Sequence, residues 1–387
     1  MIRSARLLTA FSLSALTLAS CANAENGESA PVVDVAAAPF AVSEVATFEE
    51  PWAMAFAPGT SALFVTEKAG TLKFIDTKTG TIGTVTGIPE VAYGGQGGLG
   101  DVAFVPTEVK GMIGERMIYL SWAEAGENDT RGAAVGKGKL VCPAVGKCEV
   151  SGFEVIWRQA PKVTGRGHYS HRLLFSPDGQ YLYVASGERQ KMQPSQDIGT
   201  TLGKIVRLNL DGTPAAGNPM ADKGGVTAEI WSYGHRNILG LDWDTEGRLW
   251  EVEHGPAGGD ELNLVKPGAN YGWPVRSNGD HYNGDPIPDH SADDGFAKPA
   301  ITWTPVIAPG EMLFYTGDMF AAWKGHALIT GLGSQALVDV VIEGESAREA
   351  ARYEFDNRLR AMAQGPDGAL WIAEDGKGAK LMKLTPR

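Results

Sequence analysis

The stretch HGPAGGDELN, residues 254–263, combines a nearly bare backbone with two acidic side chains. It follows two short apolar runs, LGLDW and RLWEVE, which flank the polar turn DTEG and are typical of a pair of strands. Backbone carbonyls and carboxylates are the oxygen ligands that a hard cation such as Ca²⁺ takes. A plain loop in which Asp260 caps a turn accounts for the same residues, so the stretch alone leaves both interpretations open.

Three further segments carry side chains that could bind or react with a small molecule. The HRN sequence at residues 235–237 directly precedes the predicted strand pair. Arg358 and Arg360 are two residues apart, which places them on one face of a strand, and guanidinium groups donate paired hydrogen bonds to planar anions. His168, in GRGHYSH, could act as a general base near pH 7. Arginines of a solvated surface strand and a structural histidine are the alternative interpretations.

These segments lie at the ends of a pattern that recurs along the chain. Each copy, called a unit here, pairs a short apolar strand with a polar turn and a second apolar or aromatic strand. The units begin at Met54, Val102, Leu173, Leu241, Met312 and Met362. Six such units predict an all-β fold, a six-bladed β-propeller in which each unit supplies the two inner strands of a four-stranded blade. A two-sheet sandwich explains alternating strands but not the recurrence.

The chain between residue 25 and residue 387 is predicted to form one domain, because no Pro/Ser-rich linker or charge run divides it. A propeller binds ligands on loops at one end of its central channel. We therefore expect the segments GGQGGLG, GRGHYSH, GHRN, HGPAGGDELN and DNRLR to converge on one face.

Composition excludes some partners. The formal net charge of −12 argues against a nucleic acid or an anionic membrane surface. The 50 glycines among 387 residues favour many tight turns and hence many short strands.

Residues 1–24 are predicted to be a signal peptide, with a basic start and a short apolar stretch. The sequence ANA at 22–24 suits ordinary cleavage, whereas LASC at 18–21 resembles a bacterial lipobox with Cys21 as the lipidated residue. The lipobox is favoured because a cysteine in this place has little other use in a discarded leader. We expect a periplasmic protein whose only membrane attachment is this lipid anchor.

The two remaining cysteines, Cys142 and Cys148, flank a turn that contains proline and glycine. Their spacing fits a disulfide that clamps a hairpin or loop, which an exported protein permits. A metal site would need another soft ligand nearby, and the local sequence offers none.

Several motifs of other folds are incomplete here. GGQGGLG contains G-x-G-x-x-G, but an apolar strand pattern follows it instead of a helix. GTTLGK is one residue short of a phosphate-binding loop and lacks the Ser or Thr that should follow Lys204. No G-x-S-x-G nucleophile motif occurs, and DHSADDG lacks the spacing of a helix-loop-helix calcium loop.

Seven motifs in a fixed order resemble a known family. They are GGQGGLGDVAF, HYSHRLLFSPDG, GKIVRLNLDGT, GHRNILGL, EHGPAGGDELN, NYGWP and RLRAMAQGPDG. In this order the chain resembles the soluble pyrroloquinoline quinone (PQQ)-dependent aldose sugar dehydrogenases, the glucose/sorbosone dehydrogenase family. The resemblance runs from PWAMAFAP to LMKLTP, and the family's six-bladed propeller agrees with the repeat.

The resemblance implies a metal site and a cofactor site. The carbonyls of Gly255 and Pro256 would bind a Ca²⁺ ion that also holds PQQ, and Glu261 and Tyr271 match calcium-binding positions. PQQ is a planar tricarboxylate, which suits arginine. The positions that match cofactor contacts are Gln96, Arg236, Asn237, Tyr282, Arg358 and Arg360.

The resemblance also assigns the chemistry, which is oxidation of an aldose at C1 to the lactone. His168 matches the catalytic base, which removes the hydroxyl proton while hydride passes to PQQ. Ca²⁺ would polarise the accepting carbonyl, and Arg236 would stabilise the oxyanion that forms. His171 is interpreted as a structural residue without a role in the chemistry. The sequence names neither the sugar nor the electron acceptor.

The chain departs from the family at one cofactor contact. Many relatives carry a lysine there in the fifth unit, but TGLGSQALVDV places Gly333, Ser334 and Gln335 at this point, and neither Lys324 nor Lys377 aligns with it. This absence favours, as an alternative, a non-catalytic propeller that binds a glycan or a protein partner. A calcium-dependent, lactonase-like hydrolase is a further alternative, which would need no arginine cluster.

Overall fold

The computed structural model describes residues 30–144 and 146–387, and its regular structure consists of β-strands and short 3-10 helices. The predicted all-β class is therefore confirmed. The predicted signal peptide and Cys21 lie outside the described residues. No helix in the described part of the chain is long and apolar enough to cross a membrane.

The strands of the described residues form five sheets. The nine-stranded sheet contains β3 (Pro51–Phe56), β4 (Ala62–Glu67), β5 (Thr71–Asp76), β6 (Ile82–Thr86), β7 (Leu99–Ala103), β8 (Arg116–Ala125), β9 (Thr130–Ala144), β10 (Lys147–Arg158) and β11 (Val163–Thr164). One four-stranded sheet contains β12 (Ser170–Phe175), β13 (Tyr181–Ser186), β14 (Lys204–Asn209) and β15 (Ile230–Tyr233). The next contains β16 (Ile238–Trp243), β17 (Leu249–Glu253), β18 (Asp260–Leu264) and β19 (Ile301–Trp303).

The last two sheets include strands from both ends of the chain. One contains β20 (Pro309–Phe314), β21 (Ala327–Gly331), β22 (Ala336–Glu343), β23 (Ser346–Glu354) and β1 (Val32–Asp34). The other contains β24 (Leu359–Gln364), β25 (Leu370–Glu374), β26 (Ala379–Pro386) and β2 (Phe40–Phe48). The 3-10 helices are η1 (Val35–Ala37), η2 (Gln193–Ser195), η3 (Ala221–Lys223), η4 (Gly225–Glu229) and η5 (Ala321–Trp323).

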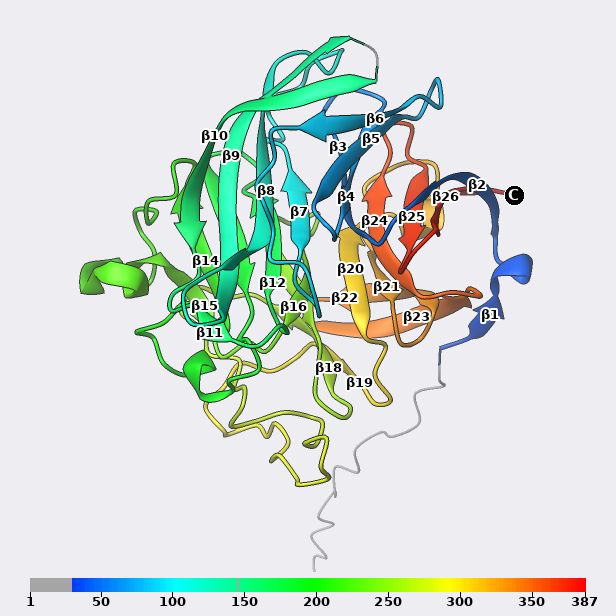
Figure 1. The fold of residues 1–387 in the computed structure, drawn as a ribbon. Helices are drawn as coiled ribbons and strands as arrows, with labels where there is room; N and C mark the ends of the chain where they lie inside the picture. Colours follow the sequence, from blue (N-terminus) through cyan, green and yellow to red (C-terminus); the bar gives the residue numbers. More distant parts are fainter. Residues whose placement is uncertain (1–29, 145) are drawn as a thin grey trace, which may run out of the picture.

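Each predicted unit corresponds to an antiparallel strand pair. The pairs are β3–β4, β7–β8, β12–β13, β16–β17, β20–β21 and β24–β25. Their first strands contact one another in chain order, and β24 contacts β3, so these strands form a closed ring. Pairing of β2 with β26 joins the two ends of the chain, blue beside red in Figure 1.

Apolar side chains are buried between successive sheets. Tyr119 and Trp157 of the nine-stranded sheet pack with Phe175 of the next sheet, for example, and Trp250 packs with Phe314. A two-sheet sandwich would instead hold its core between two sheets only. The many interfaces hold the strands around one centre, so the loops at their ends have a fixed scaffold.

The cysteine prediction is confirmed. Cys142 near the end of β9 and Cys148 in β10 form a disulfide with an S–S distance of 2.02 Å. Cys148 is also part of the hydrophobic cluster that contains Val85 and Val150.

Two of the incomplete motifs have structural roles. Lys204 is buried at the start of β14, where its Nζ donates hydrogen bonds to the carbonyls of Pro194, Ser195 and Leu202. A Cβ atom at Gly100 would lie 2.2 Å from the ring of His171, so close packing of β7 requires glycine there.

Candidate active site

A cavity of about 310 Å³ lies where the first strands of the units begin and the second strands end. This volume is at the lower end of the range typical of small-molecule sites. Lining residues at or just before the first strands are Glu50, Pro51, Trp52, Gly95, Gln96, Tyr169, Ser170, His171, Asn237, Leu239, Arg358 and Arg360. Those just after the second strands are Lys68, His254, Leu332, Asp375 and Gly376. The expected convergence of these loops is confirmed.

The predicted site residues divide between this cavity and its surroundings. Gln96, Asn237, Arg358 and Arg360 line it. Arg236 instead lines a small adjoining pocket with Gly255, Glu261 and Tyr271. The loop that leads from β18 to β19 contributes Tyr271, and the bridges Tyr233–Asn270 and Ala257–Asp280 hold it in place.

Arg358 and Arg360 point toward the same carboxylate. Their Nε atoms each donate to Asp375 at 2.9 Å. Burial alone would raise the pKa of Asp375, but Arg360 and Arg358 hold it below its ordinary value. Asp375 therefore orients both guanidinium groups through Nε. Their terminal nitrogens make no hydrogen bond with the described residues and can donate to an anion in the cavity.

His168 lies beside the cavity and is held from two sides. Its backbone N–H donates to Gln96 Oε1 at 2.6 Å, and its Nδ1 is hydrogen-bonded to Glu188 Oε1. Burial lowers the pKa of His168 below its ordinary value, and Arg236 lowers it further, although Glu188 acts in the opposite direction. The ring is therefore neutral at pH 7. With the Nδ1 proton directed at Glu188, Nε2 is the atom that can accept a proton.

Glu188 is a site residue to which the sequence analysis gave no role. It lies in GERQ, just after β13. Its second oxygen accepts the N–H of Met192 at 2.6 Å. The signal that could have found it is an acidic residue just after a second strand, at the same end as His168.

Arg236 and Asn237 connect the histidine loop with the glycine-rich loop. Asn237 Oδ1 accepts the N–H of Ser170 at 3.3 Å. Arg236 donates to the His254 carbonyl at 3.1 Å and to the Tyr282 hydroxyl at 3.3 Å. Tyr282 is 77% exposed and thus available to a ligand at the surface.

His171 has a structural environment, in agreement with the prediction. Its ring lies 4.6 Å from that of Trp52, and its Nδ1 lies 3.3 Å from Ser121 Oγ. Burial lowers its pKa to about 3, so this histidine stays neutral.

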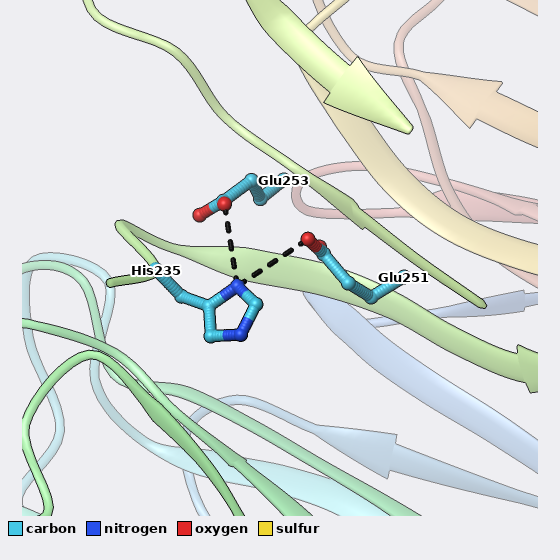
Figure 2. A group of neighbouring side chains, drawn as sticks. All are labelled: His235, Glu251 and Glu253. Carbon is cyan, nitrogen blue, oxygen red and sulfur yellow. Dashed lines mark ion pairs between the residues drawn. The ribbon is translucent and has the colours of Figure 1, made fainter. Parts of the chain in front are cut away.

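A buried group of acidic residues lies under the glycine-rich loop. Figure 2 shows His235 between Glu251 and Glu253, with Nδ1 3.4 Å and 3.5 Å from their carboxylates. Glu261 pairs with Glu253 across β17 and β18, and Asn263 donates to Glu251 at 2.8 Å. Burial raises the pKa of Glu261, and the charges of Glu253 and Glu251 raise it further.

The oxygens of this group fit a hard cation. His235 lies between Glu251 and Glu253, which raise its pKa to about 9 against the effect of burial, so the protonated imidazole is itself a cation beside these carboxylates. Glu251 Oε2 and Asn263 Oδ1 are buried without a hydrogen-bond partner among the described residues. Unpaired buried oxygens are costly, and a bound cation would satisfy them. The acidic pair of β17, Glu251 and Glu253, was not predicted from the sequence, because both residues resemble the polar positions of an ordinary strand.

The four predicted calcium ligands differ in how they could contribute. A Cβ atom at Gly255 would lie 2.3 Å from the carbonyl oxygens of both Gly258 and Gly259, so glycine is required where these oxygens gather. Pro256 is buried but does not line the small pocket. The Tyr271 hydroxyl already donates to Leu264 O at 2.6 Å, which leaves its carbonyl as the available ligand.

A family model described as Glucose / Sorbosone dehydrogenase matches residues 48–383. The chain belongs to the glucose/sorbosone dehydrogenase family. The resemblance stated from its motifs is thereby confirmed, and the chain is an oxidoreductase of this family.

The most informative relatives of this family cover nearly the whole chain. Aldose sugar dehydrogenase YliI of Escherichia coli is 35% identical over 344 residues, which are 88% of this chain and 91% of the relative. The apo crystal structure of the soluble E. coli aldose sugar dehydrogenase superimposes with a TM-score of 0.83 at 34% identity, over 90% of this chain and 100% of that one. The PQQ-bound aldose sugar dehydrogenase of Streptomyces coelicolor gives a TM-score of 0.70 at 27% identity, over 90% and 100%.

The departure from the family pattern lies at the edge of the cavity. The N–H groups of Gly333 and Ser334 donate to Ile307 O at 2.9 Å and 3.0 Å, and the side chain that lines the cavity here is Leu332. A lysine from the first unit, Lys68, lines the cavity instead, and it was not predicted from the sequence.

Proposed function

We propose that this protein oxidises aldose sugars at C1 to the lactone, with PQQ as the hydride acceptor and Ca²⁺ as an essential ion. The observation that carries the proposal is a neutral, carboxylate-paired histidine beside a cavity that contains two fixed arginines. This arrangement offers a base for the sugar hydroxyl and donors for a planar, multiply charged anion.

The residues that would hold PQQ are Gln96, Asn237, Arg358 and Arg360, which line the cavity, and Arg236 and Tyr282 beside it. When bound, PQQ would supply a hydride-accepting quinone, and Ca²⁺ would supply a Lewis acid beside it. Arg358 and Arg360 contribute charge-assisted hydrogen bonds, and Asp375 keeps both groups aligned.

His168 would take the proton of the C1 hydroxyl at Nε2. Glu188 keeps the Nδ1 proton in place and stabilises the imidazolium that forms, because its carboxylate raises the pKa of His168 relative to burial alone. Arg236 lies close enough to lower that pKa and would stabilise negative charge that develops beside the histidine.

The ligands of Ca²⁺ would be the backbone carbonyls of Gly255, Pro256 and Tyr271 and the carboxylate of Glu261. Three observations support this assignment: the oxygens gathered at Gly255, the pocket shared by Gly255, Glu261 and Tyr271, and the unpaired buried oxygens nearby. Ca²⁺ accepts such a mixed set of carbonyl and carboxylate ligands.

We further infer that the domain from residue 25 to residue 387 is a single six-bladed propeller. The ring of first strands supports this count. So does the nine-stranded sheet, which divides into two runs of antiparallel neighbours, β3 to β6 and β7 to β10, joined by the parallel pair β6–β10.

Export to the periplasm and attachment through Cys21 are also part of the proposal. The disulfide Cys142–Cys148 supports export, because such bonds persist in oxidising compartments. Cys21→Ser should move the protein from the membrane fraction to the soluble fraction. A wild-type protein that is already soluble and begins at Glu25 would contradict the anchor.

Reconstitution tests the activity. Purified protein is incubated with PQQ and Ca²⁺, and dye reduction is measured with a panel of aldoses. We expect sugar-dependent reduction that requires both additions. Failure to bind PQQ at micromolar concentrations contradicts the proposal, and lactone hydrolysis without PQQ would indicate the hydrolase.

A further inference from the structure

One lysine enters the central cavity from the first unit. Lys68 is the first residue after β4, just as His254, Leu332 and Asp375 are the first residues after β17, β21 and β25. All four line the cavity. In these four units, the first residue after the second strand thus reaches the cavity. Of these four residues, Lys68 is the one with a cationic side chain.

The contacts of Lys68 hold its ammonium group at the cavity wall. Nζ donates to the Gly95 carbonyl at 3.1 Å and lies 3.6 Å from Glu50 Oε1. The other oxygen of Glu50 accepts the Tyr93 hydroxyl at 2.6 Å, which orients the carboxylate. An ammonium group has three protons, so these two contacts leave one for a ligand. The side chain is 23% exposed and therefore within reach of a molecule in the cavity.

Lys68 also determines the sign of the cavity's charge. The charged side chains of the lining are Lys68, Arg358, Arg360, Glu50 and Asp375. The formal charge of these five side chains is +1 with Lys68 and zero without it.

We propose that Lys68 binds an anionic group of the molecule in this cavity, which for PQQ is one of its carboxylates. The inference rests on the proposed function, because that function supplies the tricarboxylate. Arg358 and Arg360 would hold other parts of the same anion. The fifth unit contributes the apolar Leu332 at the position that corresponds to Lys68. Lys68 should therefore provide a larger share of the binding free energy of the anion.

Binding of PQQ to the apoprotein tests this role without reference to turnover. Apoprotein with saturating Ca²⁺ is titrated with PQQ, and the quenching of tryptophan fluorescence gives Kd. Lys68→Met should raise Kd about tenfold, since a hydrogen bond to a charged group is lost. Lys68→Arg, which keeps the charge, should recover most of the affinity. Lys78→Met is the matched control, because this exposed lysine of the same unit lies outside the cavity.

A second variant should shift affinity in the opposite direction. Glu50→Gln removes an acidic group from the lining and frees Lys68 from its ion pair, so PQQ should bind more tightly. Should Lys68→Met fail to fold, Glu50→Gln carries the test, and an unchanged or weaker affinity overturns the inference.

The outcomes separate the inference from the proposed function. Wild-type protein that does not bind PQQ overturns the proposed function, and the inference falls with it. Wild-type protein that binds PQQ while Lys68→Met binds equally well overturns the role of Lys68 alone. Equal losses in Lys68→Met and Lys78→Met do the same, because they would reflect net charge and not a contact.

Discussion

The two ends of the ring of first strands differ in the charge they present. At the end where these strands begin, the cavity contains Lys68, Arg358 and Arg360. At the end where they finish, a hollow of about 560 Å³ is lined by carboxylates, apolar side chains, Thr316 and Gln364, and none of its described lining residues is basic. The acidic residues there are Asp101, Asp242, Asp244 and Glu311.

The carboxylates of the second end have structural partners. Asp101 accepts the N–H of Leu173 at 2.8 Å, and Asp242 accepts that of Phe314 at 2.7 Å, so each ties one first strand to the next. Arg172 lies between the ends, paired with Glu311 and donating to the Leu239 carbonyl at 2.6 Å. Around the ring, side chains at the second end thus connect neighbouring first strands, whereas side chains at the first end have hydrogen-bond donors that are free for a ligand. In the proposed function, the first end is the reactive one.

The largest expected effect is at the histidine of the reactive end. His168→Ala removes the proposed base, and turnover should fall about 10²–10⁴-fold while PQQ affinity stays nearly unchanged. Single-turnover rates and PQQ titrations measure the two quantities separately. Full activity in this variant would leave the fold and cofactor in place but remove His168 from the mechanism.

The next effect is on cofactor affinity at the same end. Arg358→Ala should weaken PQQ binding about 10- to 100-fold, the loss typical of a charge-assisted hydrogen bond. The PQQ titration measures this directly, with Arg348→Ala as control, because Arg348 is an exposed arginine of β23 paired with Glu343. Equal affinity in both variants would show that the anion does not use Arg358.

A change at the acidic end should affect stability and not chemistry. Asp242→Ala leaves the N–H groups of Trp243 and Phe314 without their acceptor, which should lower the free energy of unfolding by about 1–3 kcal/mol. Denaturant unfolding gives this value, and kcat of the folded fraction should be unchanged. A loss of kcat would mean that the two ends are coupled, contrary to the comparison.

The smallest effect concerns the pH dependence of the rate. In the proposed mechanism His168 acts in its neutral form, so the rate should be full above its pKa and should be lost as the pH falls through it. Because burial places that pKa below its ordinary value, the acid limb of kcat/KM should lie below pH 6.5. Glu188→Gln removes the group that raises the pKa, so the limb should move to lower pH. Movement to higher pH would contradict the pairing.

Much of this site was predictable because its signals are local. Alternating apolar strands gave the repeated units, and a spacing of two residues placed Arg358 and Arg360 together. The loops that precede the first strands were recognised from their polar and glycine-rich residues, which include Gln96, His168 and Asn237. Each of these features depends on neighbours within a few positions, and so it is visible in the sequence.

The sequence by itself therefore determined the strand periodicity, the family and the residues of the motifs. Only the tertiary structure decided that Lys68 of the first unit shares a cavity with Arg358 of the last, because these positions meet only when the ring closes through β24 and β3. It also decided that Asp375 aligns both arginines, and that Glu188 is hydrogen-bonded to His168. Such contacts depend on the burial and geometry of several sheets at once, and no local pattern of residues encodes them.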